Sequence, residues 1–167
     1  MTSLRPPDRL RWLFLDLNSY FASVEQNEMP DLRGQPVAVL PLMSDSTCVI
    51  AASYEAKKFG IKTGTPVWEA KQKCPGIVLV SGRHDLYVEY HHRILEEVEK
   101  HIPVTNICSI DEVGCLLDPR EQKREVAVAL AHAIKEGLRK NIGPCIRCSI
   151  GLAPSRLLAK IGTDMQK

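Results

Sequence analysis

The sequence lacks any long apolar run, internal repeat or low-complexity tract. No segment reaches the roughly 18 apolar residues that a membrane span requires. Residues 1–11 are polar and contain proline, so they lack the apolar stretch of a secretory signal. These absences argue against a membrane partner and predict an intracellular protein.

A strong basic excess is also missing, because the formal net charge is only +2. DNA-binding domains usually carry a larger one, so charge alone does not indicate a nucleic-acid partner. The six cysteines do not require a disulfide scaffold, since a chain of 167 residues with 44% hydrophobic residues can bury its own core. We therefore expect reduced thiols.

Apolar periodicity predicts a mixture of short strands and amphipathic helices. Residues 11–17 (RWLFLDL) form an apolar run with a single acid near its end, which is typical of a buried strand. Helical spacing is clearest in residues 85–101. Helices are expected at residues 18–26, 53–59, 66–73, 85–101, 122–140 and 155–165, and strands at residues 11–17, 36–40, 47–52, 77–80, 105–109, 113–117 and 145–151.

The order of these elements predicts an α+β fold. When residues 18 to about 80 are set aside, the chain reads strand, helix, strand, strand, helix, strand. This is the ferredoxin-like, split βαβ pattern. The segment set aside becomes an inserted subdomain of small helices and a hairpin.

Three acids stand at strand ends that this fold brings together. Asp16 closes the first strand, and Asp111 and Glu112 lie at a hairpin bend 95 positions later (111 − 16). The first strand and the central hairpin are neighbours in a split βαβ sheet, so the carboxylates can converge. Converging carboxylates repel one another unless a divalent cation holds them, and hard oxygen ligands suit Mg²⁺. The alternative is that these acids cap turns and face water.

Four sequence segments match motifs of one family. They are FLDLNSYFASVE at residues 14–25, SYEAKKFGI at 53–61, SIDE at 109–112, and SIG at 149–151 followed by LAKI at 158–161 and DM at 164–165. In this order they resemble the motifs of Y-family, translesion-type DNA polymerases. The resemblance is greatest to the bacterial DNA polymerase IV branch, the DinB-type or ImpB/MucB/SamB group.

The resemblance implies a ferredoxin-like palm at residues 1–17 and 80–167 and an inserted small fingers subdomain at residues 18–79. The thumb and little finger of the family find no counterpart, so we expect a truncated protein that is nearly inactive alone. The implied activity is template-directed addition of deoxynucleotides to a primer 3′ end by two-metal nucleotidyl transfer. The implied cofactors are two Mg²⁺ ions, for which Mn²⁺ can substitute.

Carried over by position, Asp16 and Asp111 would ligate both metal ions. Glu112 would ligate the ion that activates the primer 3′-hydroxyl, and the carbonyl of Leu17 would complete the other ion. Phe21 falls at the family's steric gate, the aromatic ring that excludes a ribose 2′-hydroxyl. The remaining nucleotide contacts implied are Tyr54, Lys57 and Lys167.

Two of the departures from the family pattern bear on catalysis and on phosphate binding. Asn18 replaces the second acid of the common D-x-D, which is not an essential ligand, so the resemblance still implies catalysis. Lys57 replaces the usual arginine, which predicts a looser grip on phosphate because a lysine offers a point charge in place of a planar fork. The implied partners are primer–template DNA, deoxynucleoside triphosphates and a sliding clamp that binds a missing C-terminal region, and the implied location is the bacterial cytoplasm at the nucleoid.

Other interpretations remain open at this point. A diguanylate-type cyclase uses the same palm, but its G-G-D-E-F hairpin is absent. A non-catalytic polymerase-like accessory protein of induced mutagenesis typically loses the metal acids, whereas all three are present. Cys145 and Cys148 form a lone C-x-x-C, which is weak evidence for zinc. His91 is expected to be solvated.

Overall fold

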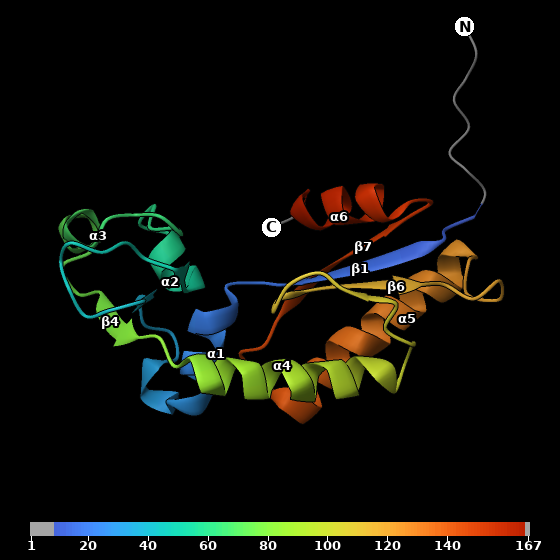
Figure 1. Ribbon diagram of the computed structural model, residues 1–167, viewed down its shortest axis with the longest axis horizontal. Helices are drawn as coiled ribbons and strands as arrows, with labels where there is room; N and C mark the ends of the chain where they lie inside the picture. Colours follow the sequence, from blue (N-terminus) through green and yellow to red (C-terminus); the bar gives the residue numbers. More distant parts are fainter. Residues whose placement is uncertain (1–8, 166–167) are drawn as a thin grey trace, which may run out of the picture. The chain divides into compact units, whose positions relative to one another are not determined.

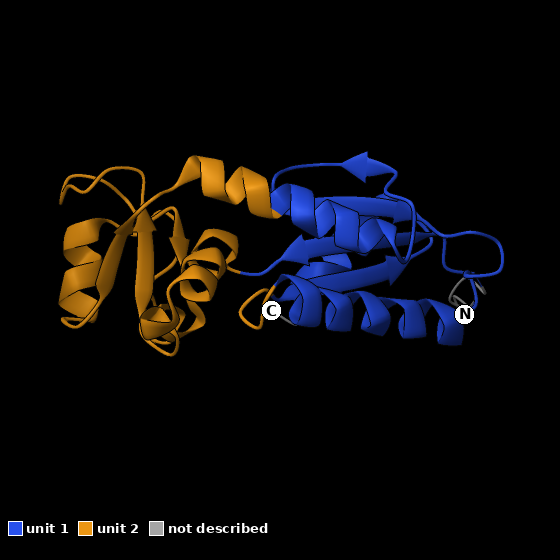
Figure 2. Ribbon diagram, turned by 90° about the horizontal axis from the view of Figure 1, so that it is seen from below, with its two compact units in different colours: residues 1–18, 91–142, 147–167 blue, residues 19–90, 143–146 orange. Residues whose placement is uncertain are grey.

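Residues 9–165 are described in a computed structural model of the chain (Figure 1). They divide into two compact units, which Figure 2 colours separately. Unit 1 comprises the described parts of residues 1–18, 91–142 and 147–167, and unit 2 comprises residues 19–90 and 143–146. No helix among the described residues is long and apolar enough to cross a membrane.

Unit 1 contains a four-stranded antiparallel sheet. Its strands are β5 (Asn106–Ile107), β6 (Glu112–Leu116), β1 (Trp12–Leu17) and β7 (Cys148–Ala153), in that spatial order. The first strand of the described residues is therefore central, and its apolar residues Leu13, Phe14, Leu15 and Leu17 are almost completely buried. This order is that of the ferredoxin-like pattern, so the predicted α+β fold class is confirmed.

Helices cover both faces of this sheet (Figure 1). Helix α6 (Arg156–Asp164) lies on one face, whereas α5 (Arg124–Gly137) and the second half of α4 (His84–Glu99) lie on the other. A π-helical segment, Leu138–Ile142, continues α5. The helix expected at residues 122–140 is thus present, with a changed winding in its last turns.

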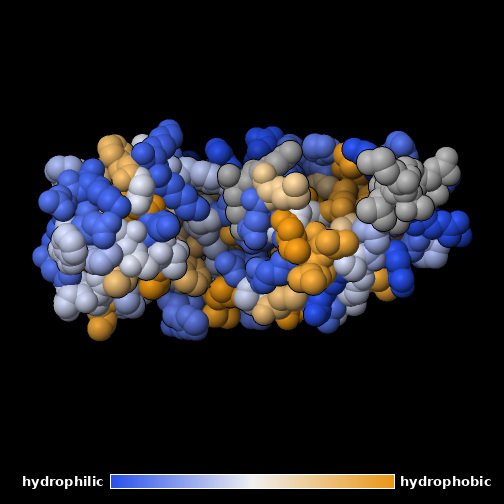
Figure 3. Space-filling view, turned by 90° about the horizontal axis from the view of Figure 1, so that it is seen from above, coloured by the Kyte–Doolittle hydropathy of each residue, from blue (hydrophilic) through white to orange (hydrophobic). Residues whose placement is uncertain are grey.

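Gly151 of β7 lets α6 approach the sheet closely. A Cβ atom at this position would lie 1.9 Å from the carbonyl oxygen of Ala159, so only glycine fits. Ala159 and Thr163 are buried on this side of the helix. The opposite side exposes Leu157, Leu158 and Ile161, and apolar side chains gather on the face that Figure 3 shows.

Unit 2 is built on a three-stranded sheet in the order β3 (Ala51–Ala52), β2 (Val37–Leu40), β4 (Val78–Ser81). β2 pairs antiparallel with β3 and parallel with β4. Small apolar side chains of the strands and of the helices form its core. Its helices are α1 (Tyr20–Glu28), the 3₁₀ segment Pro30–Leu32, α2 (Tyr54–Lys57), α3 (Val67–Lys73) and the first half of α4.

Three expected strands are shorter or displaced. The strand expected at 47–52 keeps only Ala51–Ala52, because the amide of Val49 bonds instead to the carbonyl of Thr65 (2.9 Å). The strand expected at 145–151 begins at Cys148, because the amide of Ile146 closes a turn onto the carbonyl of Gly143 (3.1 Å). The strand expected at 105–109 is reduced to Asn106–Ile107.

Candidate active site

The three acids lie at one end of the β1–β6 ladder in unit 1. Asp16 of β1 is the direct cross-strand partner of Glu112, the first residue of β6. Asp111 precedes β6, and its carbonyl accepts the amide of Leu17 (2.9 Å). Adjacent antiparallel strands place such partners on the same face of the sheet. The folded backbone thus brings together the positions that sequence analysis singled out as the metal acids.

Each of the two hairpin carboxylates is held by a neighbouring side chain. The hydroxyl of Ser109 donates to Oδ1 of Asp111 (2.5 Å), and the ammonium of Lys160 donates to Oε2 of Glu112 (2.8 Å). The bond to Glu112 raises the pKa of Lys160 above its ordinary value of 10.5. In the described part of the chain, no three acid, histidine or cysteine side chains are gathered as a metal site would gather them.

The donor set nevertheless fits a hard divalent cation. Asp16 is 9% exposed, so its carboxyl group lies at the margin of the core, whereas Asp111 and Glu112 are partly open to solvent. Three carboxylates at one sheet edge create a negative site, and a cation, the ammonium of Lys160, already lies against one of them. Oxygen donors of this kind are those that Mg²⁺ and Mn²⁺ prefer.

One contributor to this site was missed from the sequence. Nδ1 of His91 on α4 donates to the carbonyl of Ile110 (2.8 Å), so the histidine fixes the turn that carries Asp111. The expectation that His91 is simply solvated is wrong, because its side chain is partly buried against this turn. A histidine on a charged helix gives no sequence signal for such a contact.

The aromatic ring of Phe21 lies in unit 2, on the first turn of α1. It stacks on the ring of Tyr87, with centroids 4.3 Å apart and planes at 16°. The hydroxyl of Tyr20 donates to the backbone carbonyl of Tyr87 (2.7 Å), which ties α1 to α4 beside the stack. Phe21 itself is only partly buried, so one part of the ring is supported and another is accessible.

A buried acid stands behind this stack. Glu25 is fully buried, and its carboxylate accepts the hydroxyl of Tyr87 (2.7 Å) and a two-point contact from the guanidinium of Arg83. Burial is the main cause that raises the pKa of Tyr87 well above its ordinary value, and the hydrogen bond to Glu25 raises this pKa further. The phenol is therefore a permanent donor. Sequence analysis missed Glu25, although a carboxylate on the apolar side of α1 was a visible signal.

Two of the other residues predicted to contact the nucleotide share one short helix. Tyr54 and Lys57 both lie on the short helix α2, where the Lys57 ammonium is 5.7 Å from the Tyr54 ring centroid. The side chain of Ser53 caps this helix by accepting the amide of Ala56 (3.2 Å). Lys167 lies outside the described residues.

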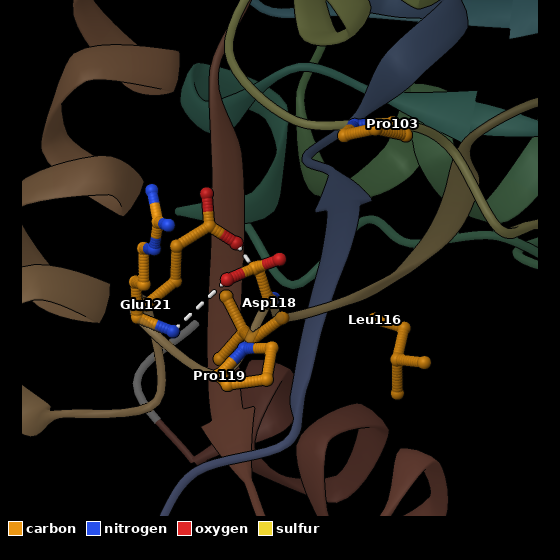
Figure 4. Close-up of a pocket in the computed structure, with 7 residues that line it drawn as sticks. Pro103, Leu116, Asp118, Pro119 and Glu121 are labelled. Atoms are coloured by element: carbon orange, nitrogen blue, oxygen red, sulfur yellow. Dashed lines mark hydrogen bonds between the residues drawn. The ribbon is translucent and has the colours of Figure 1, made fainter.

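The hollow shown in Figure 4 is not at the acids. It has a volume of about 630 Å³ and is lined by Pro103 and by residues 116–121, which comprise the last residue of β6 and the loop after it in unit 1. Two backbone amides of its lining donate within the loop, that of Asp118 to Glu121 (2.8 Å) and that of Arg120 to Asp118 (3.0 Å). It opens beyond the last residue of β6, whereas Glu112 is the first.

The two cysteines of the C-x-x-C differ in exposure. Cys148 is buried in β7, Cys145 is partly exposed before it, and both are free thiols. Burial raises the pKa of the Cys148 thiol to about 12, which keeps it protonated.

The sequence matches known proteins over most of its length. A sequence model of the impB/mucB/samB family matches residues 15–164. DNA polymerase IV of Moorella thermoacetica is 42% identical over 157 residues, which cover 93% of this chain and 39% of the relative. The chain thus spans about two fifths of the length of this curated relative.

The fold matches solved structures as well. A Y-family DNA polymerase chimera, Dbh-Dpo4(243-245)-Dbh, aligns with a TM-score of 0.86 and 32% identity over 94% of this chain and 46% of that chain. DinB from Sulfolobus solfataricus aligns with a TM-score of 0.83 and 34% identity over the same shares. Sequence and fold together show that the chain belongs to the impB/mucB/samB family of Y-family DNA polymerases.

Proposed function

We propose that this chain is the palm and fingers portion of a translesion-type, template-directed DNA polymerase. The observation that carries the proposal is the pairing of Asp16 with Glu112 across β1 and β6, with Asp111 next to it. The chain's family and the neighbours' titles, which name DNA polymerases, support the same reaction. Unit 1 would be the palm and unit 2 the fingers. The units divide after residues 18 and 90, whereas the sequence boundaries are 17/18 and 79/80.

In this proposal the acids hold two Mg²⁺ ions, or Mn²⁺ in their place. Asp16 and Asp111 would contact both ions, Glu112 the ion on the primer side, and the Leu17 carbonyl the other. Bound at this edge, two divalent ions would stabilise the attacking and leaving oxygens of an in-line displacement. The chain itself contributes a fixed set of oxygen donors, because the β1–β6 ladder sets their spacing.

The side chains of unit 2 would select and hold the incoming nucleotide. Phe21, supported from behind by Tyr87, would collide with a ribose 2′-hydroxyl and so reject ribonucleotides. Tyr54 and Lys57 would contact the triphosphate, and Lys167 would add a further phosphate contact. These roles rest on the match to the family motifs.

The partners follow from the same proposal. Primer–template DNA and deoxynucleoside triphosphates would be the substrates, a sliding clamp a partner of the longer protein, and the nucleoid in the bacterial cytoplasm the location. The mild net charge of +2 agrees with a chain in which other domains bind most of the duplex.

The alternative is a non-catalytic accessory protein of mutagenesis that keeps the polymerase fold. The three acids favour the enzyme, because a scaffold would have no reason to place them at one strand edge. Magnesium-dependent primer extension by the full-length protein separates the two functions. Template-directed extension that EDTA abolishes supports the enzyme, and DNA binding without extension at any Mg²⁺ or Mn²⁺ concentration supports the accessory protein.

A further inference from the structure

A lysine from α6 lies against the acid edge of unit 1. The Lys160 ammonium is 2.8 Å from Oε2 of Glu112 and 5.7 Å from the centroid of the Phe14 ring. Its neighbour Ala159 is buried where α6 meets Gly151, so the root of the lysine side chain is fixed on the sheet. The lysine reaches the acid edge because the close contact between α6 and Gly151 fixes the position of the helix on the sheet.

We propose that Lys160 is a resident counter-ion of Glu112, which a divalent metal ion must displace when it binds the three acids. The inference rests on the proposed function, since it concerns the same carboxylates. It adds a positioning residue: the lysine neutralises part of the acid edge in the metal-free protein and competes for one of its oxygen donors. It contacts Glu112 and no reacting atom.

The electrostatics support an exchange of cations. Asp16 is the cross-strand partner of Glu112, and Asp111 precedes it in the chain, so the edge holds three like charges. A cation near such a cluster lowers the repulsion, and one ammonium supplies half the charge of one divalent ion. Removing the ammonium leaves a more negative site, which a divalent ion should bind more tightly.

The exchange is also accessible. The side chain of Lys160 is 48% exposed and that of Glu112 is 19% exposed, so water reaches the pair. Exposed ion pairs of this kind contribute little net stability. The ammonium can therefore leave Glu112 for solvent without unseating α6, which Gly151 and the buried Ala159 hold independently.

The test is Mn²⁺ binding by this chain, followed through the electron paramagnetic resonance signal of the free ion. We expect Lys160→Gln to bind Mn²⁺ about fivefold more tightly than the unchanged chain, or about 1 kcal/mol. Lys160→Arg keeps the charge and should bind like the unchanged chain. Lys140→Gln, an exposed lysine in the π-helical segment, removes the same charge away from the acids and is the matched control.

Asp111→Asn separates failure of this inference from failure of the metal site. If Asp111→Asn weakens Mn²⁺ binding but Lys160→Gln leaves it unchanged or weakens it, the acids bind metal and the counter-ion role is wrong. If neither the unchanged chain nor Lys160→Gln binds Mn²⁺, both the metal site and the inference are overturned. Circular dichroism of each variant checks that the fold is retained.

Discussion

The ring of Phe21 rests on the ring of Tyr87, whose hydroxyl is held by the buried carboxylate of Glu25. Arg83, which precedes α4, neutralises that carboxylate, so Phe21 and Glu25 of α1, Tyr87 of α4 and Arg83 form one connected support. A ring held in this way can discriminate between sugars by collision, because it has little freedom to tilt aside. The proposed gate can therefore be tested by measuring the selectivity between ribonucleotides and deoxynucleotides.

We predict that Phe21→Ala in the full-length protein raises ribonucleotide incorporation far more than it lowers deoxynucleotide incorporation. The ring would exclude the 2′-hydroxyl sterically, and alanine removes that collision. Single-nucleotide kcat/KM values for the two sugars measure the effect. Phe59→Ala, at an exposed ring of the same unit, is the control. Unchanged sugar selectivity in Phe21→Ala would make this ring an ordinary packing residue.

We predict that Asp111→Ala and Glu112→Ala each reduce nucleotide incorporation by the full-length protein at least about 100-fold. The fold should survive, because both side chains are partly exposed and each change removes a repelling charge. Single-turnover incorporation and circular dichroism measure the two properties. Glu136→Ala on the exposed side of α5 is the matched control. Near wild-type incorporation by either acid variant would refute the metal-site assignment.

We predict opposite effects for two glycines that face each other. Gly151→Ala should destabilise the chain by about 1–3 kcal/mol or more, because the new methyl group meets the Ala159 carbonyl oxygen at 1.9 Å. A Cβ atom added at Gly162 of α6 would lie 3.5 Å from its nearest neighbour, the Cα atom of Gly151. Gly162→Ala should therefore be neutral, or stabilise the chain by up to about 1 kcal/mol. Urea denaturation midpoints measure both. Equal midpoints for the two variants would mean that α6 does not seat on Gly151 as described.

We predict that Glu97 of α4 contributes to the stability of the fold in a pH-dependent way. Its carboxylate accepts bonds from Lys100 (2.7 Å) and from Asn141 (3.0 Å), and the bond to Lys100 is the main cause that lowers its pKa below the ordinary 4.5. A lowered pKa stabilises the fold above pH 4.5, and this stabilisation is lost as the pH falls further. Glu97→Gln should therefore show a flatter loss of stability below pH 4.5 than the unchanged chain.

Denaturation midpoints between pH 7 and pH 3 measure this slope. Glu99→Gln, on the exposed side of the same helix, is the matched control. A slope in Glu97→Gln that equals that of the unchanged chain would contradict the role of this carboxylate.

We predict that this 167-residue chain alone binds primer–template DNA weakly and is nearly inactive. A net charge of +2 offers few phosphate contacts, and positioning of the primer end carries a large share of the rate, about 7–11 kcal/mol in well-oriented reactions. Fluorescence anisotropy with labelled primer–template in a salt series measures the binding. Tight binding with a steep salt dependence would show that these two units carry the main grip on DNA.

The strands that carry the acids could be predicted from sequence because their signals are local. Residues 11–17 are apolar and end at an acid, and the split βαβ rule places such a strand beside the central hairpin. That rule predicts that the two strands are neighbours, and the structure adds the register that pairs Asp16 with Glu112. The metal and nucleotide roles of these residues remain predictions.

The contacts that surround the sites could not be predicted, because they join distant parts of the chain. Glu25 is 62 positions from Tyr87, and Lys160 is 48 positions from Glu112. Such contacts depend on how each helix packs against a distant segment, and the apolar periodicity of a sequence does not show this packing. The bond from Val49 to Thr65, which shortened the expected hairpin strand, has the same origin.

The position of β1 in its sheet has a consequence for synthesis of the chain. β1 is made first, yet its partners β6 and β7 begin at Glu112 and Cys148. At roughly 5–20 residues per second, the about 94 residues between β1 and the start of β6, its first partner, take about 5–19 s to emerge from the ribosome. During that interval Leu13, Phe14 and Leu15 have no sheet to enter, so the nascent chain presents an apolar segment that chaperones can bind. Residues 19–90, the contiguous main part of unit 2, can fold before β1 has a partner strand.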